Sequence, residues 1–592
     1  MISESIRWTG QALSRSHGTI EFGIAVSFWA LSITVVNPVG EFPIIDDGLY
    51  EYIVKHVLTT GEFPNPEPAS ATLVTNIYWG AAFCLWKGAS FTMLRVSTLV
   101  ASLLGLFGLL ELAKDFGISF HFRILMALTL AFAPTYHALS YSFMTDVPFT
   151  ALVIWSSVFF VRSLNSGSLI YLSAATLLTI IAVLSRQIAL SMPVAHCICL
   201  YLKDHRRLSW TQTLRLAVPV FLPAAALWEY FHILSSTHRL PITYNFFSNI
   251  MMSTLTHSSA LAKVPFINLY ATVMYLGLFL LPVLLALVGG PFRYRVKTFW
   301  FLFSVGLGLT VTGALIRLKS GLSDAVPLPE SHVLVPSGIG LLWLRGDQSV
   351  PVLPAEFWAL VTLLAVLGSV LLLVQLSALG SDLVHFIGEN SWRIGSRAGV
   401  LYLALSGLIL LYPYLFAGTS DRYLTPALPL LAVAIAGTHL WRPREAGRLQ
   451  TLTHASAIVA LIGTVIFSVV GTRDYLAWHR VTSFASRGLI DGMGVPPEHI
   501  DGGEEFNAYY PTYQGHESEI EFSDLDHDPS GYVFNDEIKR QNEAVEREAW
   551  RPANVQYVVG FDSIPGYSII QEYSYYNWMP PHRQRILVLR RN

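Results

Sequence analysis

Long apolar segments, separated by short polar ones, make up most of this chain. A helix that crosses a membrane needs about 20 mostly apolar residues. By that rule we expect thirteen spans, at 18–37, 92–111, 124–140, 147–162, 168–185, 187–202, 213–231, 266–289, 298–316, 356–379, 398–417, 423–441 and 453–471. The stretch near 72–90 is a candidate re-entrant or surface helix. The pattern predicts an all-α polytopic membrane domain over residues 1–471.

The composition agrees with this interpretation. Of the 592 residues, 53% are hydrophobic and only 13% are charged, whereas a soluble domain carries about 25% charged residues. The net charge of −2 gives no reason to expect a nucleic-acid partner. The three cysteines lie in apolar surroundings, which excludes a disulfide framework. The first apolar run lacks a signal-peptide cleavage site, so we expect it to be retained as a span.

The basic residues indicate an orientation. Loops on the N-terminal side of the membrane hold more Lys and Arg than those on the other side, which favours an N-terminus inside the cell. An odd number of spans then places residues 472–592 outside. This stretch is more polar and contains β-like runs at 555–559 and 586–589. We expect a small extracytoplasmic α/β domain on a multi-pass protein of the plasma (inner) membrane.

Two adjacent carboxylates, Asp46 and Asp47, follow the first span. The apolar residues after them have helical spacing, which predicts a short helix along the membrane surface within a first outer loop at 38–91. A carboxylate here could do no more than cap that helix. The pair alone therefore does not define a catalytic site.

Further charged residues border spans on the same outer side. Asp146 precedes the fourth expected span, Arg186 follows the fifth, Arg95 lies near the outer end of the second, and Arg422 opens the twelfth. Ionisable residues in such places are costly and are candidates for function, although an Arg can extend to head groups and an Asp can cap a helix. Carboxylates suit the activation of a hydroxyl, and guanidiniums suit the binding of phosphate. Together they indicate group transfer from a phosphate-linked lipid to a hydroxyl.

The order of these motifs resembles the GT-C membrane glycosyltransferases, specifically the family 39 type that includes protein O-mannosyltransferases and lipid A aminoarabinose transferases. The resemblance rests on the acidic pair, on Asp146, on Arg186 and on Asp421-Arg422-Tyr423. The segments 474–478 and 500–507 and the layout of spans and outer domain also match. In the family the second acid is often Glu and the basic residue often Lys, so this chain departs at Asp47 and Arg186.

The resemblance implies a hexosyl or pentosyl transferase that uses a polyprenyl-phosphate sugar on the extracytoplasmic face and inverts the anomeric centre. Asp46 would be the general base, although which member of the pair with Asp47 acts stays open. Asp146 would position the acceptor or, with Asp46, hold a divalent metal. Arg186, with Arg95 or Arg422, would neutralise the donor phosphate. The acceptor would be a lipid, a glycan or a protein.

Two other functions fit part of the pattern. A surface-polysaccharide ligase or polymerase would also use lipid-linked glycans. A transporter or flippase of a lipid-linked substrate would show repeated halves and charges near the bilayer midplane, and no repeat is visible. The outer segments 232–265 and 317–355 are long enough to form lids or binding loops. The sequence does not specify the sugar, the acceptor or the lipid chain length.

Overall fold

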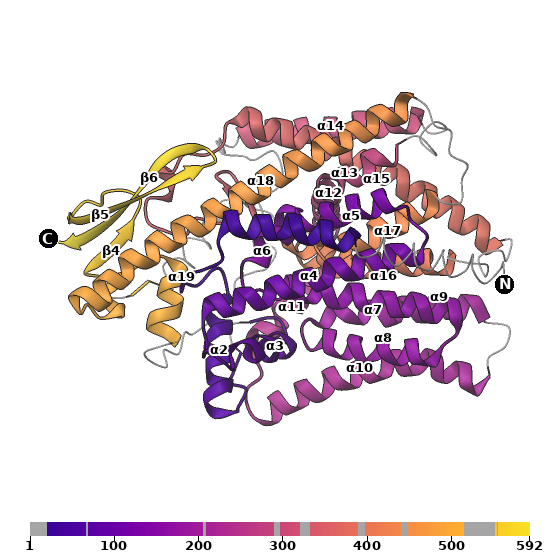
Figure 1. The fold of residues 1–592 in the computed structure, drawn as a ribbon, viewed down its shortest axis with the longest axis horizontal. Helices are drawn as coiled ribbons and strands as arrows, with labels where there is room; N and C mark the ends of the chain where they lie inside the picture. Colours follow the sequence, from indigo (N-terminus) through magenta and orange to yellow (C-terminus); the bar gives the residue numbers. More distant parts are fainter. Residues whose placement is uncertain are drawn as a thin grey trace.

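Helices dominate the structure. The computed structural model describes residues 20–66, 69–204, 209–288, 296–319, 332–388, 397–439, 448–513, 551–552 and 554–592. Within them, long helices lie side by side in an elongated bundle, and a small sheet lies at one end (Figure 1). The predicted all-α membrane architecture with a small C-terminal sheet region is confirmed.

An apolar helix, or a bent pair of helices, coincides with each expected span. Seven described helices are long and apolar enough to cross a membrane, or eight if α5 and α6, bent by 63°, form one span. Length and composition alone therefore do not fix the number of crossings. The segments are Ile20–Val36, α4 (Phe91–Asp115), α5 (Phe120–Ala131) with α6 (Pro134–Ser140), α7 (Asp146–Ser166), α8 (Leu169–Val183), α9 (Ser191–Asp204), α10 (Trp210–Ser236), α12 (Ser258–Phe279), α14 (Val296–Lys319), α15 (Ala355–Gly388), α16 (Arg397–Ala417), α17 (Ala427–His439) and α18 (Arg448–Arg487).

Prolines account for two interruptions. Pro134 stands at the start of α6, where a residue without a backbone N–H is tolerated and the preceding helix must end. Pro282 stands likewise at the start of α13 (Leu281–Ala286) and divides the span expected at 266–289. The chain can therefore bend inside two apolar segments that hydropathy alone treats as single helices.

The two expected outer loops contain more structure than we predicted. Most of 232–265 is helical, because α10 reaches Ser236 and is followed by η2 (Ile242–Asn245) and α11 (Phe246–Thr256). Thr254 on α11 is buried and donates to the Phe416 carbonyl, so α11 packs against α16. In the other segment, residues 320–331 lie outside the described residues, and the remainder includes the short hairpin β1 (Leu334–Val335) and β2 (Gly338–Ile339).

The first outer loop folds into α2 (Asp47–Thr60) and α3 (Val74–Cys84). The short helix predicted after the acidic pair is therefore present, and it ends at Gly61, whose φ of 75° favours glycine. Figure 1 shows α2 running across the ends of the longer helices, on the same side of the molecule as the sheet.

The C-terminal region joins the bundle through one long helix. Helix α18 continues unbroken past residue 471, where we expected the domain boundary. Beyond it lies a sheet of four strands in the order β3-β4-β6-β5, with only the β3–β4 pair parallel. The strands are β3 (Ile500–Asp501), β4 (Tyr557–Gly560), β5 (Tyr567–Trp578) and β6 (Pro581–Arg591), so both predicted β-like runs fall on strands.

Candidate active site

A cavity of about 690 Å³, here called the central cavity, lies between α2, the ends of several long helices and the C-terminal region. Its wall combines apolar and aromatic side chains with a few charged groups, the usual make-up of a ligand site. Its polar lining includes Asp46, Tyr50, Arg186, Arg422, Tyr475 and Glu505.

The two adjacent aspartates point to different places. Asp46 lines the central cavity, and 51% of its side-chain surface is exposed there. Asp47 is fully buried and accepts hydrogen bonds from the backbone N–H groups of Ile44, at 2.5 Å, and Phe143, at 3.3 Å. Ile45, just before the pair, has a φ of 56°, which is unusual for a β-branched residue. The turn thus presents Asp46 to a ligand and uses Asp47 to hold the backbone.

Burial shapes the acidity of both carboxyls. The protein that encloses the cavity desolvates Asp46 and raises its pKa, an effect that the nearby Arg422 partly offsets. Burial raises the pKa of Asp47 to about 7, although the charge of Arg95 and two backbone hydrogen bonds oppose the shift. A carboxylate with a raised pKa is a better proton acceptor near neutral pH.

Arg186, just after the end of α8, lines the cavity, and contacts with two other side chains fix its guanidinium. Its guanidinium forms an ion pair of 2.9 Å with Asp146, at the start of α7, and its Nε donates to Thr145 Oγ1 at 2.8 Å. Asp146 is fully buried and is not part of the cavity wall. Burial lowers the pKa of Arg186, but the charge of Asp146, with smaller contributions from Tyr414 and Tyr423, outweighs burial and keeps the pKa above its ordinary value. Asp146 therefore fixes the position of the Arg186 guanidinium.

Arg422 enters the cavity from η6 (Asp421–Leu424). Asp421 is fully buried and accepts from the N–H groups of Val333, at 3.1 Å, and Leu334, at 2.8 Å, which anchors this turn. Nη1 of Arg422 lies 3.8 Å from Asp46 Oδ2, too far for a hydrogen bond. Its Nε and Nη1 are buried and have no hydrogen-bond partner among the described residues.

An aromatic ring lies beside both guanidiniums. The centroid of the Tyr423 ring is 5.3 Å from Cζ of Arg422 and 5.9 Å from Cζ of Arg186, within the range of cation–π attraction. Tyr423 in turn stacks on Tyr414 at 4.8 Å between centroids. The two cations are thus arranged on one rigid aromatic wall of the cavity.

Arg95, which we expected at the donor phosphate, is not brought to the central cavity. It is fully buried and donates to the carbonyl oxygens of Pro38, Gly40 and Phe42. Its guanidinium also lies 4.1 Å from the centroid of the Phe42 ring. Its contacts hold the start of the first outer loop.

The residues present do not fit the metal site expected at Asp46 and Asp146. A hard divalent cation takes several oxygen ligands, whereas Asp146 is already in an ion pair with Arg186. In the part of the chain that the structure describes, no group of three or more His, Cys, Asp or Glu side chains could hold a metal ion. Asp46 and Asp146 therefore do not form the shared metal site that was expected.

The C-terminal region adds residues that we did not expect in the site. Tyr475, Glu505 and Tyr509 all line the central cavity. Burial raises the pKa of Glu505 to about 8, and the negative charges of Asp47 and Asp46 contribute. The segments 474–478 and 500–507 also matched the family, but only the acids after Gly502-Gly503, at the start of α19 (Glu504–Asn507), offered a local signal of function. From the expected outer segments, Tyr244 and His332 also reach the wall.

Comparison with known proteins gives likeness of fold only. No family model and no curated protein matches the chain. The structure of ArnT from Cupriavidus metallidurans bound to undecaprenyl phosphate is 13% identical, covers 96% of this chain and 97% of that one, and gives a TM-score of 0.45. The archaeal oligosaccharyltransferase AglB from Archaeoglobus fulgidus, in complex with an inhibitory peptide and a dolichol-phosphate, is 12% identical over 91% of this chain and 69% of that one, with a TM-score of 0.42.

Proposed function

We propose that this protein transfers a sugar from a polyprenyl-phosphate-linked donor to an acceptor hydroxyl in the central cavity. The observation that carries the proposal is Arg422, a buried guanidinium in the cavity wall whose Nε and Nη1 lack hydrogen-bond acceptors among the described residues. Each such unmet donor costs about 1–3 kcal/mol. The oxygens of a phosphate would satisfy both groups, since a guanidinium binds them in a planar fork.

The neighbouring groups complete the chemistry. Arg186 adds a second cation on the same wall, and Asp46 adds a carboxylate whose nearest oxygen is 3.8 Å from Arg422. A bound phosphate at the arginines therefore places the sugar that it carries beside Asp46. This arrangement suits a reaction in which negative charge develops on the leaving phosphate, because preorganised cations in a poorly hydrated cavity stabilise that charge.

The reaction is a single displacement. The acceptor oxygen attacks the anomeric carbon, the bond from that carbon to the phosphate oxygen breaks, and its electron pair stays on the polyprenyl phosphate. Asp46 takes the proton from the acceptor hydroxyl as the new bond forms. The anomeric configuration inverts, because the acceptor and the leaving phosphate occupy opposite faces of the carbon.

Three further residues act through those that touch the substrate. Asp47 holds the turn that presents Asp46, Asp146 holds Arg186, and Arg95 holds the chain that leads into the turn. Each is buried and engaged with protein groups. We therefore assign them positioning roles in place of the catalytic and phosphate-binding roles first expected.

The bias of basic residues supports an extracytoplasmic site, since Asp46, Arg186 and Arg422 all follow or precede spans on the side poor in Lys and Arg. The sheet region lies on that side too. A surface-polysaccharide ligase or polymerase would use the same phosphate-binding wall with a larger donor. A flippase would use it without forming a glycosidic bond.

The test is a transfer assay on the purified protein, with a labelled polyprenyl-phosphate sugar and an envelope fraction as acceptor. Asp46→Asn keeps the shape of the side chain but cannot take a proton, so turnover should fall at least about a hundredfold. The Asp46→Asn protein should keep the thermal midpoint of the wild type. Near-normal turnover in Asp46→Asn would refute the role of the base, and movement of the labelled lipid without a new glycosidic bond would favour the flippase.

A further inference from the structure

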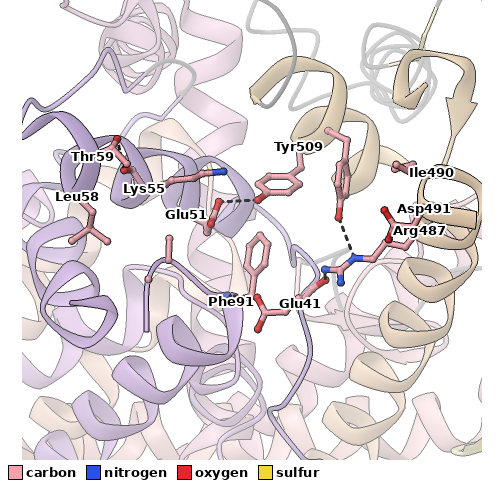
Figure 2. A pocket seen from close by; sticks show the side chains of 13 residues that line it. Glu41, Glu51, Lys55, Leu58, Thr59, Phe91, Arg487, Ile490, Asp491 and Tyr509 are labelled. Atoms are coloured by element: carbon pink, nitrogen blue, oxygen red, sulfur yellow. Dashed lines mark hydrogen bonds between the residues drawn. The ribbon is translucent and has the colours of Figure 1, made fainter. Parts of the chain in front are cut away.

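A second cleft of about 590 Å³ shares Tyr509 with the wall of the central cavity, and Figure 2 shows the side chains that line it. We call it the α2 cleft. It is formed by α2, the start of α4, the end of α18 and the turn η9 (Ala508–Tyr513). None of the groups assigned to the transfer reaction lines it.

Helix α2 separates the two spaces and contributes a different face to each. Tyr50, near its start, lines the central cavity. Glu51, Lys55 and Thr59 line the α2 cleft and follow one another at intervals of four residues, which places them on one side of the helix. With a rise of 1.5 Å per residue, Glu51 lies about 7.5 Å from Asp46 along the helix axis. The distance from a ligand group bound beside Glu51 to Asp46 is therefore about the length of one or two sugar residues.

Tyr509 is the one described side chain shared by both walls. Its hydroxyl donates to Glu51 Oε2 at 2.9 Å, as Figure 2 shows. Its ring packs on the backbone at Gly48, where an added Cβ would meet the ring at 3.3 Å, and contacts the edge of Phe91 at 5.3 Å between centroids. Tyr509 therefore belongs to both walls and, together with α2, separates the cleft from the central cavity.

The floor of the α2 cleft is aromatic. Phe91, Tyr509 and Tyr510 line it, with 4.9 Å between the centroids of the two tyrosine rings. The Tyr510 hydroxyl accepts from Arg487 Nε at 3.3 Å, which restrains its ring. Rigid rings of this kind offer an apolar surface with a polar edge, and this matches the flat carbon face and the surrounding hydroxyls of a sugar.

The charged groups of the α2 cleft have both signs. Glu41 is occupied, because its carboxylate caps the start of α4 through Ser90, Phe91 and Thr92. Lys55 and Asp491 line the cleft and make no side-chain hydrogen bond or ion pair among the described residues. The acids would repel a bare phosphate, and a hydrocarbon chain would leave every charge unsatisfied. A polyhydroxylated ligand can donate to Asp491 and Glu51 and accept from Lys55 at the same time.

We propose that the α2 cleft binds the saccharide part of the acceptor, and that the acceptor hydroxyl reaches Asp46 past Tyr509. The role as acceptor rests on the proposed function, whereas the binding of a saccharide does not. The natural acceptor is then a glycan or a glycolipid.

The test measures saccharide binding to the full chain in lipid nanodiscs, without donor, by saturation-transfer NMR. The probes are the methyl glycosides of glucose, glucosamine and glucuronic acid. At least one should bind, and Tyr510→Ala should weaken it about threefold to tenfold, the range expected for one aromatic contact. Tyr510→Phe, which keeps the ring, should retain most of the binding. Tyr576→Ala, at an exposed tyrosine on β5, is the matched control and should change nothing.

The outcomes separate the two proposals. The cleft proposal is overturned if no probe binds while polyprenyl phosphate still does, or if binding survives Tyr510→Ala but is lost in Arg422→Met, which would place the saccharide in the central cavity. If the probes bind as expected but no acceptor fraction supports transfer by the wild type, the proposed function and the acceptor role fail, and saccharide binding by the cleft stands.

Discussion

Replacing Arg422 with methionine is the most direct test of the proposed phosphate binding in the central cavity. The guanidinium is buried, and its Nε and Nη1 have no hydrogen-bond partner among the described residues. Methionine fills a similar path with apolar atoms, so it removes the two unmet donors. Arg422→Met therefore distinguishes two effects: the loss of stability caused by unpaired N–H donors in the free protein, and the gain in affinity when those donors bind a phosphate.

The structure gives opposite signs for the two effects. Without donor, losing two unmet buried donors should relieve about 1–3 kcal/mol each. The remaining charge of Asp46 is half exposed to the cavity, which limits the penalty of leaving it without a counter-ion. With donor, the same change removes two charge-assisted hydrogen bonds of about 1.5–3 kcal/mol each. This corresponds to a loss of affinity for polyprenyl phosphate of about 10²-fold to 10⁴-fold.

The assay is the thermal midpoint of the detergent-solubilised protein, with and without undecaprenyl phosphate, supported by native mass spectrometry of the complex. Arg422→Met should melt at the wild-type temperature or higher without the lipid, and the lipid should no longer raise its midpoint. Arg583→Met, at an exposed arginine on β6, is the control and should respond to the lipid as the wild type does. An Arg422→Met protein that melts early and still binds the lipid within a factor of three would refute the reasoning.

Three further outcomes follow from the same geometry. Arg186→Ala should use the donor less well and should also lose about 3–5 kcal/mol of stability, because it leaves the buried Asp146 without its counter-ion. Arg186→Lys should retain part of both properties. Equal donor KM values and equal thermal midpoints in the wild type and both variants would count against the ion pair. Burial raises the pKa of Glu505 from its ordinary 4.5 to about 8, so the folded protein retains a proton that the unfolded chain releases, and stability from this group falls as pH rises through that window. Glu505→Gln should therefore gain thermal midpoint over the wild type progressively from pH 5 to pH 8, and a constant difference would contradict the burial of this carboxyl. A reporter that is active only outside the cytoplasm should be active when it is fused to Asn592, and an inactive, stable fusion would reverse the proposed orientation.

Much of the site follows from hydropathy and charge. Spans are recognisable by composition, so their ends are known approximately, and a charge at such an end is conspicuous. Asp46, Arg186 and Arg422 were expected on one side, and the structure brings all three to one cavity. The spacing of apolar residues also predicted the short helix after the acidic pair, because that spacing is a local signal.

The remaining assignments depended on partners distant in the sequence. Nothing in the sequence near Arg95 indicates that it faces the carbonyl oxygens of Pro38 and Gly40. The sequence near Asp146 likewise does not indicate its ion pair with Arg186, which lies forty residues later in the chain. Tyr509 was missed because it reaches α2 only through the tertiary arrangement of the C-terminal region.

The two adjacent aspartates have different tasks: Asp47 holds the turn, and Asp46 faces the cavity. Ile45 stands in the left-handed region, with a φ of 56°, at a cost of about 1–3 kcal/mol for a non-glycine residue. Such a turn persists only if its surroundings hold it, and Asp47 does so by accepting from Ile44 within the turn and from Phe143 on a distant segment. Because Asp47 anchors the turn, its neighbour Asp46, the proposed base, is directed away from the core into the cavity, towards Arg422. The strained residue directly precedes the proposed base, so a substitution that relaxes the turn should lower turnover before it lowers the stability of the fold.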